Sequence, residues 1–413
     1  MATVKAFCGL RFADGDIKNL VTPPYDIISP AEQEALYKKD AHNIIRLEYG
    51  KDEPGDTENE NKYTRAGAYL KDFMEKGVLK TDKAPSFYVY EETFSLPSGE
   101  KKAIKGIIAR VKLQEFSEGV ILPHEETLSK AKEDRFQLME HTFANFSQIY
   151  SLYMDEKKEI PNLLESAPKT EIADFVDEDG IRQRMWQISD AESIQKIERA
   201  FSEKQLFIAD GHHRYETGLR FKKAHPDLES AQYIMMFLID LENDGLVVFP
   251  THRVVTNLSF DAEKLLKSLT EFDVSVCEKG KGDIQNKSMP SFVMVLPDKD
   301  VVLTLKSYDY IKKAIPSGSD AYRTLDVNVL HKLILEKLGI DSLNMAQQKN
   351  LIYTRSEREA REMVYEKKAA VSFLMNATRV EQIKDVSLAG EKMPQKSTYF
   401  YPKLKTGLVM NKF

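Results

Sequence analysis

The sequence has few cysteines, no long apolar run and little net charge. Its 413 residues include only Cys8 and Cys277, too few for a disulfide framework or a thiolate metal site, which predicts a reducing compartment. No apolar stretch approaches the roughly 20 residues that span a bilayer, and residues 1–9 lack the pattern of a signal peptide. We therefore expect a cytoplasmic protein with no membrane partner. The formal net charge of −6 provides no chain-wide attraction for nucleic acid, so a nucleic-acid partner is not expected.

The composition is that of a folded protein with more than one domain. Hydrophobic residues make up 42% of the chain and charged residues of both signs 30%. The chain can therefore form two or three domains, with most charge runs on solvated helix faces. We expect an α/β protein with mixed sheets of the α+β kind, and its oligomeric state is left open. The expected regions are an N-terminal α/β region over residues 1–84, a core over residues 85–258 and a C-terminal α/β region over residues 259–413.

Apolar periodicity, caps and turn residues predict the order of helices and strands. Residues 50–61 are polar and acidic and are expected to form a mobile surface loop, and residues 242–245 are expected to be the tight turn of a hairpin. The expected helices span residues 31–39, 63–76, 190–201, 214–223, 262–272, 326–338 and 356–368. The expected strands span residues 43–49, 86–94, 103–113, 145–154, 170–176, 206–209, 233–241, 246–249, 291–296, 301–306 and 370–375.

The stretch around which the chain is organised covers residues 206–216. Residues 206–209 are apolar and of strand length, Gly211 permits a sharp turn, and the residues after it have helix-forming character. The polar residues at this strand end and helix start are Asp210, His212, His213 and Arg214. Backbone N–H groups and the helix dipole favour a phosphate at such a position. Asp210 could orient an imidazole, hold a metal ion or take a proton, although the cluster lacks the ligand spacing of a zinc site.

A second polar cluster directly follows a short apolar strand and a proline. It contains His124, Glu125, Glu126, Thr127, Lys130 and Arg135. Such a density of carboxylates, imidazole, hydroxyl and cations suits a site where a proton is removed and an anion is held. The alternative is an acidic helix start, in which the carboxylates complement the helix dipole and Lys130 pairs with Glu126.

Three further groups could contact a ligand. Tyr25 and Asp26 follow two prolines that fix an extended backbone, and the alternative is a purely structural proline turn. A predicted strand ends at the polar cluster Thr251, His252 and Arg253. Aromatic residues and lysines are interleaved in residues 390–403, which predicts either a docked loop that brings Lys396 to an anion site or a loop that only packs on the surface.

Taken together, these stretches resemble a widespread prokaryotic family catalogued as domain-of-unknown-function family 1015. Its members carry a central Ala-Asp-Gly-His-His-Arg-Tyr, which is matched here by residues 209–215. Other matching stretches are Pro-Pro-Tyr-Asp at residues 23–26, His-Glu-Glu-Thr at residues 124–127 and Met-Pro-Gln-Lys-Ser-Thr at residues 393–398. The resemblance covers nearly the full length, but the family name implies no activity.

The middle of the chain also resembles the ParB and sulfiredoxin superfamily, especially its archaeal ADP-dependent free serine kinase branch. That branch has a Pro-His-Glu-Glu-like segment and later an Asp-Gly-His-His-Arg segment, here residues 123–126 and 210–214. The resemblance implies a nucleotide-binding core within residues 85–258, embedded in a larger multi-lobed chain. Glu126 and Asp210 are 84 positions apart, more than the small kinases lead us to expect, so residues 155–200 are expected to be an insertion.

Two other branches of this superfamily match less well. Sulfiredoxin has its nucleophilic cysteine at the position that His212 occupies here, which argues against sulfinic-acid reduction. ParB binds CTP with the same loop and adds a helix-turn-helix that contacts DNA. The sequence shows no convincing helix-turn-helix, and its net acidity also weighs against DNA binding.

The resemblance and the residues together predict a phosphotransferase that acts on free serine or phosphoserine with ADP or ATP and Mg²⁺. With water as the acceptor it would be a phosphoserine phosphatase, and the alternatives are a nucleotide-binding switch of the ParB type and an inactive scaffold. The expected catalytic residues are Glu125 or Glu126 as the base, His124, Asp210 (also a possible Mg²⁺ ligand) and His213. The expected phosphate-binding residues are Gly211, His212, Arg214, Thr251, His252, Arg253 and Lys396. The expected substrate-binding residues are Tyr25, Asp26, Thr127, Lys130 and Arg135.

Overall fold

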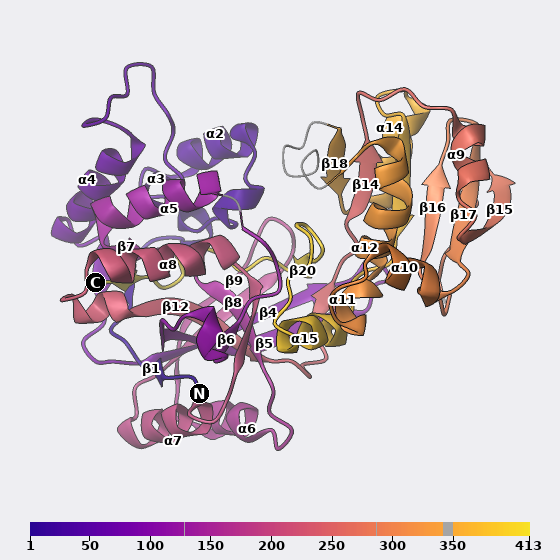
Figure 1. Cartoon of the computed structure of the whole chain (residues 1–413). Helices are drawn as coiled ribbons and strands as arrows, with labels where there is room; N and C mark the ends of the chain where they lie inside the picture. Colours follow the sequence, from indigo (N-terminus) through magenta and orange to yellow (C-terminus); the bar gives the residue numbers. More distant parts are fainter. Residues whose placement is uncertain (128, 286, 342–349) are drawn as a thin grey trace. The chain divides into compact units, whose positions relative to one another are not determined.

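The computed structural model describes residues 1–127, 129–285, 287–341 and 350–413 (Figure 1). They divide into two compact units. The first unit contains residues 1–123, 127–246 and 402–413, and the second contains residues 124–126 and 247–401. Both units combine helices with sheets, which confirms the expected mixed α/β class. The division into three regions stays a prediction. No helix in the described part of the chain is long and apolar enough to cross a membrane.

A mixed sheet of nine strands runs through the described part of the first unit. Its order is β6 (Ile121–Leu122), β11 (Leu206–Asp210), β8 (Ile149–Tyr153), β12 (Tyr233–Asp240), β5 (Lys101–Lys112), β4 (Phe87–Ser95), β10 (Arg182–Ile188) and β9 (Thr170–Val176), with β1 (Val4–Lys5) paired to β5. The pairs β6 with β11 and β8 with β12 are parallel, and the other pairs are antiparallel. The predicted strands over residues 86–94 and 103–113 are confirmed as β4 and β5, which pair antiparallel.

Helices and short strands surround this sheet. The helices are α1 (Ile17–Leu20), α2 (Pro30–Lys39), α3 (Ile45–Glu48), α4 (Lys62–Glu75), α5 (Ser129–Thr142), α6 (Glu159–Ser166), α7 (Ala191–Phe201) and α8 (His212–Ala224), with 3₁₀ turns at Tyr25–Ile27, Phe116–Glu118 and Glu229–Gln232. The short strand pairs are β2 (Leu10–Phe12) with β3 (Leu79–Thr81), and β7 (Ala144–Asn145) with β21 (Asn411–Lys412). Figure 1 shows α6 and α7 side by side. Ile107, Ile208, Met236 and Ile197 belong to one buried apolar core beneath them.

The start of α2 illustrates how local chemistry sets these elements. Ser29 Oγ accepts a hydrogen bond from the backbone N–H of Glu32 at 3.3 Å, and the Glu32 carboxylate accepts one from the N–H of Ser29 at 2.7 Å. Pro30 occupies the first turn, where its missing N–H costs nothing. This reciprocal capping box confirms the predicted helix. Asp190 caps α7 in the same manner, by accepting from the N–H of Ser193 at 2.8 Å.

The second unit is built on an antiparallel sheet of six strands in its described part. The order is β15 (Phe272–Glu278), β17 (Lys299–Leu305), β16 (Ser291–Val295), β19 (Val371–Met375), β14 (His252–Val255) and β18 (Leu351–Thr354). Its helices are α9 (Ala262–Ser268), α10 (Tyr308–Ala314), α11 (Asp320–Arg323), α12 (Asp326–Leu330), α14 (Glu357–Tyr365) and α15 (Val380–Leu388). A π-helical turn (His331–Leu335) and a 3₁₀ turn (Glu336–Leu338) continue α12, so the expected helix over residues 326–338 is confirmed in extent but is irregular.

One predicted strand and one predicted hairpin are wrong. Residues 43–49 contain α3, because the Asn43 side chain accepts a hydrogen bond from the backbone N–H of Ile45 at 2.9 Å and so starts a helical turn. The hairpin expected around residues 242–245 does not form, because β5 and β8 occupy both edges of β12. The returning segment is β13 (Val247–Val248) of the second unit, which pairs with β20 (Phe400–Tyr401) instead.

Candidate functional site

The turn between β11 and α8 is the candidate site of the first unit. β11 ends at Asp210, Gly211 has a backbone φ of +95°, and α8 begins at His212. The predicted strand, turn and helix are thus confirmed. Glycine adopts this φ without strain, and a Cβ at position 211 would lie 2.9 Å from Nε and Nη2 of Arg214. The turn therefore needs glycine, and it places Asp210 and Arg214 at the positive end of the α8 dipole.

Asp210 is a carboxylate held by two cations of the first unit. Its Oδ1 forms an ion pair with Lys403, and its Oδ2 pairs with Nη2 of Arg214 at 2.8 Å. Burial alone would raise the pKa of Asp210, but the charges of Lys403 and Arg214 outweigh burial and hold that pKa below its usual range. Asp210 is therefore ionised at neutral pH and fixes two positive charges at the start of α8. Arg214 is fixed further by donating to the carbonyl of Gln148 at 2.5 Å.

Lys403 is a site residue that the sequence predictions missed. The predictions name Lys396 as the lysine of residues 390–403 that contributes to an anion site. Lys396 belongs to the second unit, where its backbone carbonyl accepts a hydrogen bond from Arg253 at 3.1 Å. Lys403 belongs to the first unit and pairs with Asp210. The interleaved lysines and aromatic residues of this stretch are the signal from which Lys403 could have been found.

Tyr25 and Arg135 lie near this turn within the first unit. The Arg135 guanidinium stacks on the Tyr25 ring, 3.9 Å from its centroid. Burial raises the pKa of Tyr25 to about 12, and the charges of Arg135 and Arg214 act on the same hydroxyl. A cavity of about 30 Å³ is lined by side chains that include Glu48, Arg135, Ser147 and Arg214, which is room for a water molecule. The predicted substrate residues Tyr25 and Arg135 therefore share the surroundings of Arg214.

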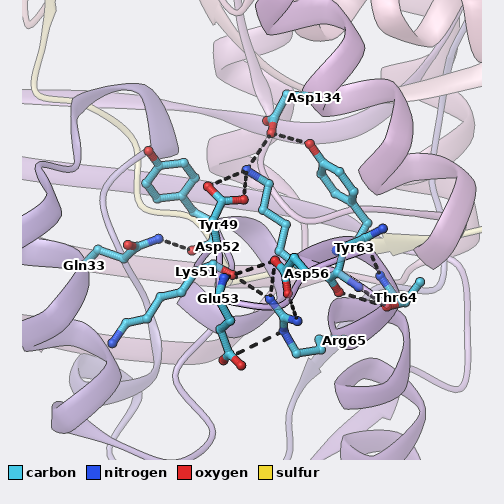
Figure 2. A network of polar contacts seen from close by, with 12 residues as sticks. Gln33, Tyr49, Lys51, Asp52, Glu53, Asp56, Tyr63, Thr64, Arg65 and Asp134 are labelled. Atoms are coloured by element: carbon cyan, nitrogen blue, oxygen red, sulfur yellow. Dashed lines mark hydrogen bonds and ion pairs between the residues drawn. The ribbon is translucent and has the colours of Figure 1, made fainter. Parts of the chain in front are cut away.

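Arg135 is bound on two sides by carboxylates. Its Nη1 lies 3.4 Å from Oε1 of Glu48, and its Nη2 lies 2.6 Å from Oδ2 of Asp134. Asp134 also accepts a hydrogen bond from the Tyr63 hydroxyl at 2.8 Å (Figure 2). The same figure shows an ion pair that links the acidic segment at residues 50–61 to α4, in which Asp56 lies 2.6 Å from Arg65. The network thus connects this segment to the environment of Tyr25.

The remaining predicted residues of the first unit surround α8. Thr127 Oγ1 donates to Oε2 of Glu216 at 2.8 Å, and Lys132 pairs with the same oxygen at 2.7 Å. His212 is buried and His213 is partly buried on the first turn of α8, and Asp26 is exposed beside Tyr25. The side chain of Lys130 lies outside the described residues.

A separate candidate site, in the second unit, joins two motifs that lie far apart in the sequence. Glu125 forms a parallel bridge with Met393, and the backbone N–H of Met393 donates to the carbonyl of His124 at 2.6 Å. The His124 ring is buried, with Nε2 at 3.0 Å from Oγ1 of Thr398. The His-Glu-Glu-Thr segment and the Met-Pro-Gln-Lys-Ser-Thr segment of the second unit therefore lie side by side.

The two adjacent glutamates face different surroundings within the second unit. Glu125 is partly buried, and its charge acts on the buried Arg253 and on the Tyr353 hydroxyl. Glu126 is exposed, and its charge acts on Tyr322. Glu125 is thus the carboxylate that lies in a cationic and partly desolvated environment.

The strand end at residues 251–253 is also in the second unit. Arg253 is 1% exposed and donates to the carbonyls of Thr251 and Lys396. His252 Nδ1 accepts from the backbone N–H of Met375 at 3.3 Å. Burial lowers the pKa of His252 to about 4, so this imidazole is neutral at neutral pH and serves as a backbone acceptor.

The predicted site residues therefore fall into one set in each unit. Tyr25, Asp26, Thr127, Arg135 and residues 210–214 belong to the first unit. Residues 124–126, residues 251–253 and Lys396 belong to the second. Among the residues that the structure describes, no group of three or more His, Cys, Asp or Glu side chains could hold a metal ion.

Comparison with solved structures finds chains of related fold at low identity. A conserved hypothetical protein from Pyrococcus furiosus is 14% identical, with a TM-score of 0.36, and the match covers 70% of this chain and 93% of that chain. A mutant free serine kinase in complex with AMP is 13% identical, with a TM-score of 0.39 and coverage of 74% and 92%. SbnI from Staphylococcus aureus, with a C-terminal truncation, is 12% identical, with a TM-score of 0.37 and coverage of 73% and 86%. At these TM-scores the likeness carries no argument about activity.

Sequence comparison gives a clearer assignment. No curated protein matches the chain. A family model described as protein of unknown function (DUF1015) matches residues 4–328. This match spans most of the chain and includes residues 23–26, 124–127 and 209–215, which carried the resemblance. The chain therefore belongs to the DUF1015 family.

Proposed function

We propose that the protein is a phosphotransferase that acts on free serine or phosphoserine with ADP or ATP. The observation that carries this proposal is the start of α8, where Asp210 fixes Lys403 and Arg214 beside a helix N-terminus. Two fixed cations and a helix dipole form a site for the oxygens of a nucleotide phosphate. Phosphoryl transfer needs such positioned charges more than it needs covalent chemistry from the protein. The sequence resemblance to the free serine kinase branch supports serine as the other substrate.

In this proposal the first unit binds the nucleotide. Arg214 and Lys403 neutralise phosphate oxygens, and Gly211 lets the backbone approach them because it has no side chain. His212 and His213 line the first turn of α8. Mg²⁺ is expected to arrive on the nucleotide phosphates and to keep several of its waters. Both oxygens of Asp210 already contact cations, so Asp210 organises those cations in this proposal, and its binding of Mg²⁺ stays a prediction.

The proposed base is Glu125 rather than Glu126. Glu125 takes the proton of the serine hydroxyl, the hydroxyl oxygen bonds to the terminal phosphorus, and the bond between that phosphorus and the nucleotide oxygen breaks. Glu125 is partly buried, its charge acts on Arg253, and a carboxylate is a suitable acceptor for the hydroxyl proton. Glu126 is exposed and lacks this partner. His124 holds Thr398 and positions the segment that carries Glu125.

The direct test is turnover by the purified chain with Mg²⁺. Serine is incubated with ADP or ATP, and phosphoserine is incubated with and without AMP or ADP, while serine, phosphoserine, phosphate and nucleotide are followed by ³¹P NMR and chromatography. Nucleotide-dependent exchange between serine and phosphoserine is expected. Phosphate released from phosphoserine without nucleotide would identify a phosphatase. Absence of turnover in every combination would overturn the proposal, and nucleotide binding without turnover would favour a ParB-type switch.

Substituting Gly211 tests the phosphate site itself. Gly211→Ala is expected to cost about 1–3 kcal/mol of stability, because alanine is strained at this φ and its Cβ collides with the Arg214 guanidinium. Displacement of Arg214 should also weaken ADP binding, which isothermal titration calorimetry measures, and denaturant unfolding measures the stability.

Gly99→Ala is the matched control for that substitution. Gly99 also has a positive φ, of +86°, but nothing lies within 4 Å of its added Cβ. This variant should therefore show the backbone strain without a change in ADP affinity. Wild-type ADP affinity in the Gly211 variant would contradict the proposed role of the turn.

A further inference from the structure

Arg253 is a buried cation that forms no ion pair with the described residues, although its guanidinium lies 5.3 Å from the centroid of the Tyr353 ring. Its Nη1 donates to the carbonyl of Thr251 and contacts Met375 Sδ at 3.2 Å, and its Nη2 donates to the carbonyl of Lys396 at 3.1 Å. Its Nε has no hydrogen-bond partner in the described part of the chain. No carboxylate that the structure describes lies within ion-pair distance of its guanidinium. The charge of Glu125 acts on it from farther away.

Burying an arginine without an ion pair is unfavourable. The buried arginine of the first unit, Arg135, is instead paired with carboxylates. Arg135 is 5% exposed and pairs with Glu48 at 3.4 Å and Asp134 at 2.6 Å. Burial of a charge that is not paired destabilises a protein strongly. An anion that approached Arg253 would relieve this cost, because arginine forms strong charge-assisted hydrogen bonds with anions.

His331 is a second buried polar group of the second unit, and the charge of Arg253 acts on it. It is 6% exposed, and neither ring nitrogen has a hydrogen-bond partner among the residues that the structure describes. Burial and the charge of Arg253 both lower its pKa well below the usual value, so the imidazole is neutral and has one N–H to donate. His331 opens the π-helical turn His331–Leu335. Such turns are rare in proteins, and those that do occur are often found at functional sites.

We propose that Arg253 and His331 bind the carboxylate group of the amino-acid substrate. One guanidinium charge and one neutral N–H donor match a singly charged carboxylate better than a doubly charged phosphate. Arginine suits this role because its planar fork of donors fits the two oxygens of a carboxylate. The choice of substrate rests on the proposed function, in which Glu125 acts on the hydroxyl of the same molecule.

Binding measurements with pairs of ligands test the proposal without requiring turnover. Isothermal titration calorimetry compares serine with ethanolamine, and phosphoserine with phosphoethanolamine, since the second member of each pair lacks only the carboxylate. The wild-type chain should bind the first member of each pair at least about tenfold more tightly, as a charge-assisted hydrogen bond is worth roughly that factor. Equal affinities within the pairs, or no binding of serine or phosphoserine, would overturn the proposal.

Two variants test whether His331 and Arg253 cause the preference for ligands with a carboxylate. His331→Leu removes both unpartnered nitrogens, so it should leave thermal stability unchanged or higher while reducing the preference for the carboxylate about tenfold. Arg253→Met should abolish the preference, and the His331 variant remains informative if Arg253→Met does not fold. His42→Leu, at a half-buried histidine of the first unit beside Asp40, is the control and should bind like the wild type.

Some results would contradict this assignment specifically. If His331→Leu lowered stability and left the carboxylate preference intact, His331 would have only a structural role. If the variant weakened phosphoethanolamine and phosphoserine equally, the site would bind phosphate instead of carboxylate. If carboxylate discrimination held while the turnover assays failed, the proposed phosphotransfer would be overturned and the carboxylate site would stand.

Discussion

Replacing Glu125 by glutamine is expected to lower kcat for serine phosphorylation by about 10²–10⁴-fold, the usual contribution of a general base. Glutamine keeps the size of the side chain but takes no proton. The affinity for ADP should stay unchanged, because in this proposal Arg214 and Lys403 bind the phosphates and Glu125 acts only on the serine hydroxyl. Single-turnover rates with saturating serine and nucleotide measure the chemical step directly.

Glu126→Gln is the matched control for the base. Glu126 is adjacent in sequence but exposed, and its charge acts on Tyr322 rather than on Arg253. Its replacement should change kcat little. If Glu126→Gln lost the activity and Glu125→Gln kept it, the roles of the two carboxylates would be exchanged. If both variants kept wild-type rates, neither carboxylate would be the base and the mechanism would need another proton acceptor. Thermal unfolding of both variants separates loss of chemistry from loss of structure.

Local chemistry explains why the centre of the candidate site was predictable from the sequence. The run from Leu206 to Asp210 is apolar up to its last residue, and Gly211 alone can take the φ of +95° that the turn requires. The start of α2 is likewise determined by Ser29, Pro30 and Glu32, which lie within one helical turn of each other. Patterns of this kind depend on neighbours in sequence, so a single sequence is sufficient to find them.

Features that depend on distant partners were missed or wrong. The returning strand at residues 246–249 was expected to pair with β12, but both edges of β12 are taken by β5 and β8, a fact that no local pattern contains. Lys403 meets Asp210 across 193 positions of sequence. Glu48 was assigned to a strand, yet it lies in α3 as the buried partner of Arg135.

His331 shows a different limit of the sequence. A histidine inside an apolar helical stretch is ordinary in a core, and nothing in residues 326–338 indicates a π-helical turn. Only its buried ring without a hydrogen-bond partner among the described residues, and the charge of Arg253 that acts on it, set it apart. The proposed carboxylate site therefore depends on packing, whereas the proposed phosphate site was visible as a motif.

The substitution Arg135→Met is expected to destabilise the first unit by about 3–5 kcal/mol, the usual cost of removing one partner of a buried ion pair. It leaves the buried Glu48 carboxylate with the Ser147 hydroxyl, at 2.8 Å, as its remaining direct partner among the described side chains. Burial already raises the pKa of Glu48, and loss of Arg135 removes the largest opposing charge. The midpoint of urea unfolding measures the loss, and Glu48→Gln in the same chain should restore part of it.

Arg182→Met provides the comparison that decides the role of Arg135. Arg182 pairs with Asp174 at 2.6 Å, but both side chains are open to solvent, at 50% and 30% exposure, so its loss should cost less than about 1 kcal/mol. A similar small cost for Arg135→Met would mean that Glu48 and Asp134 do not hold Arg135 in place. Arg135 would then be available to bind substrate, as the sequence predicted. A large cost that Glu48→Gln relieves would instead show that Arg135 has a structural role as the partner of Glu48 and of the Tyr25 ring.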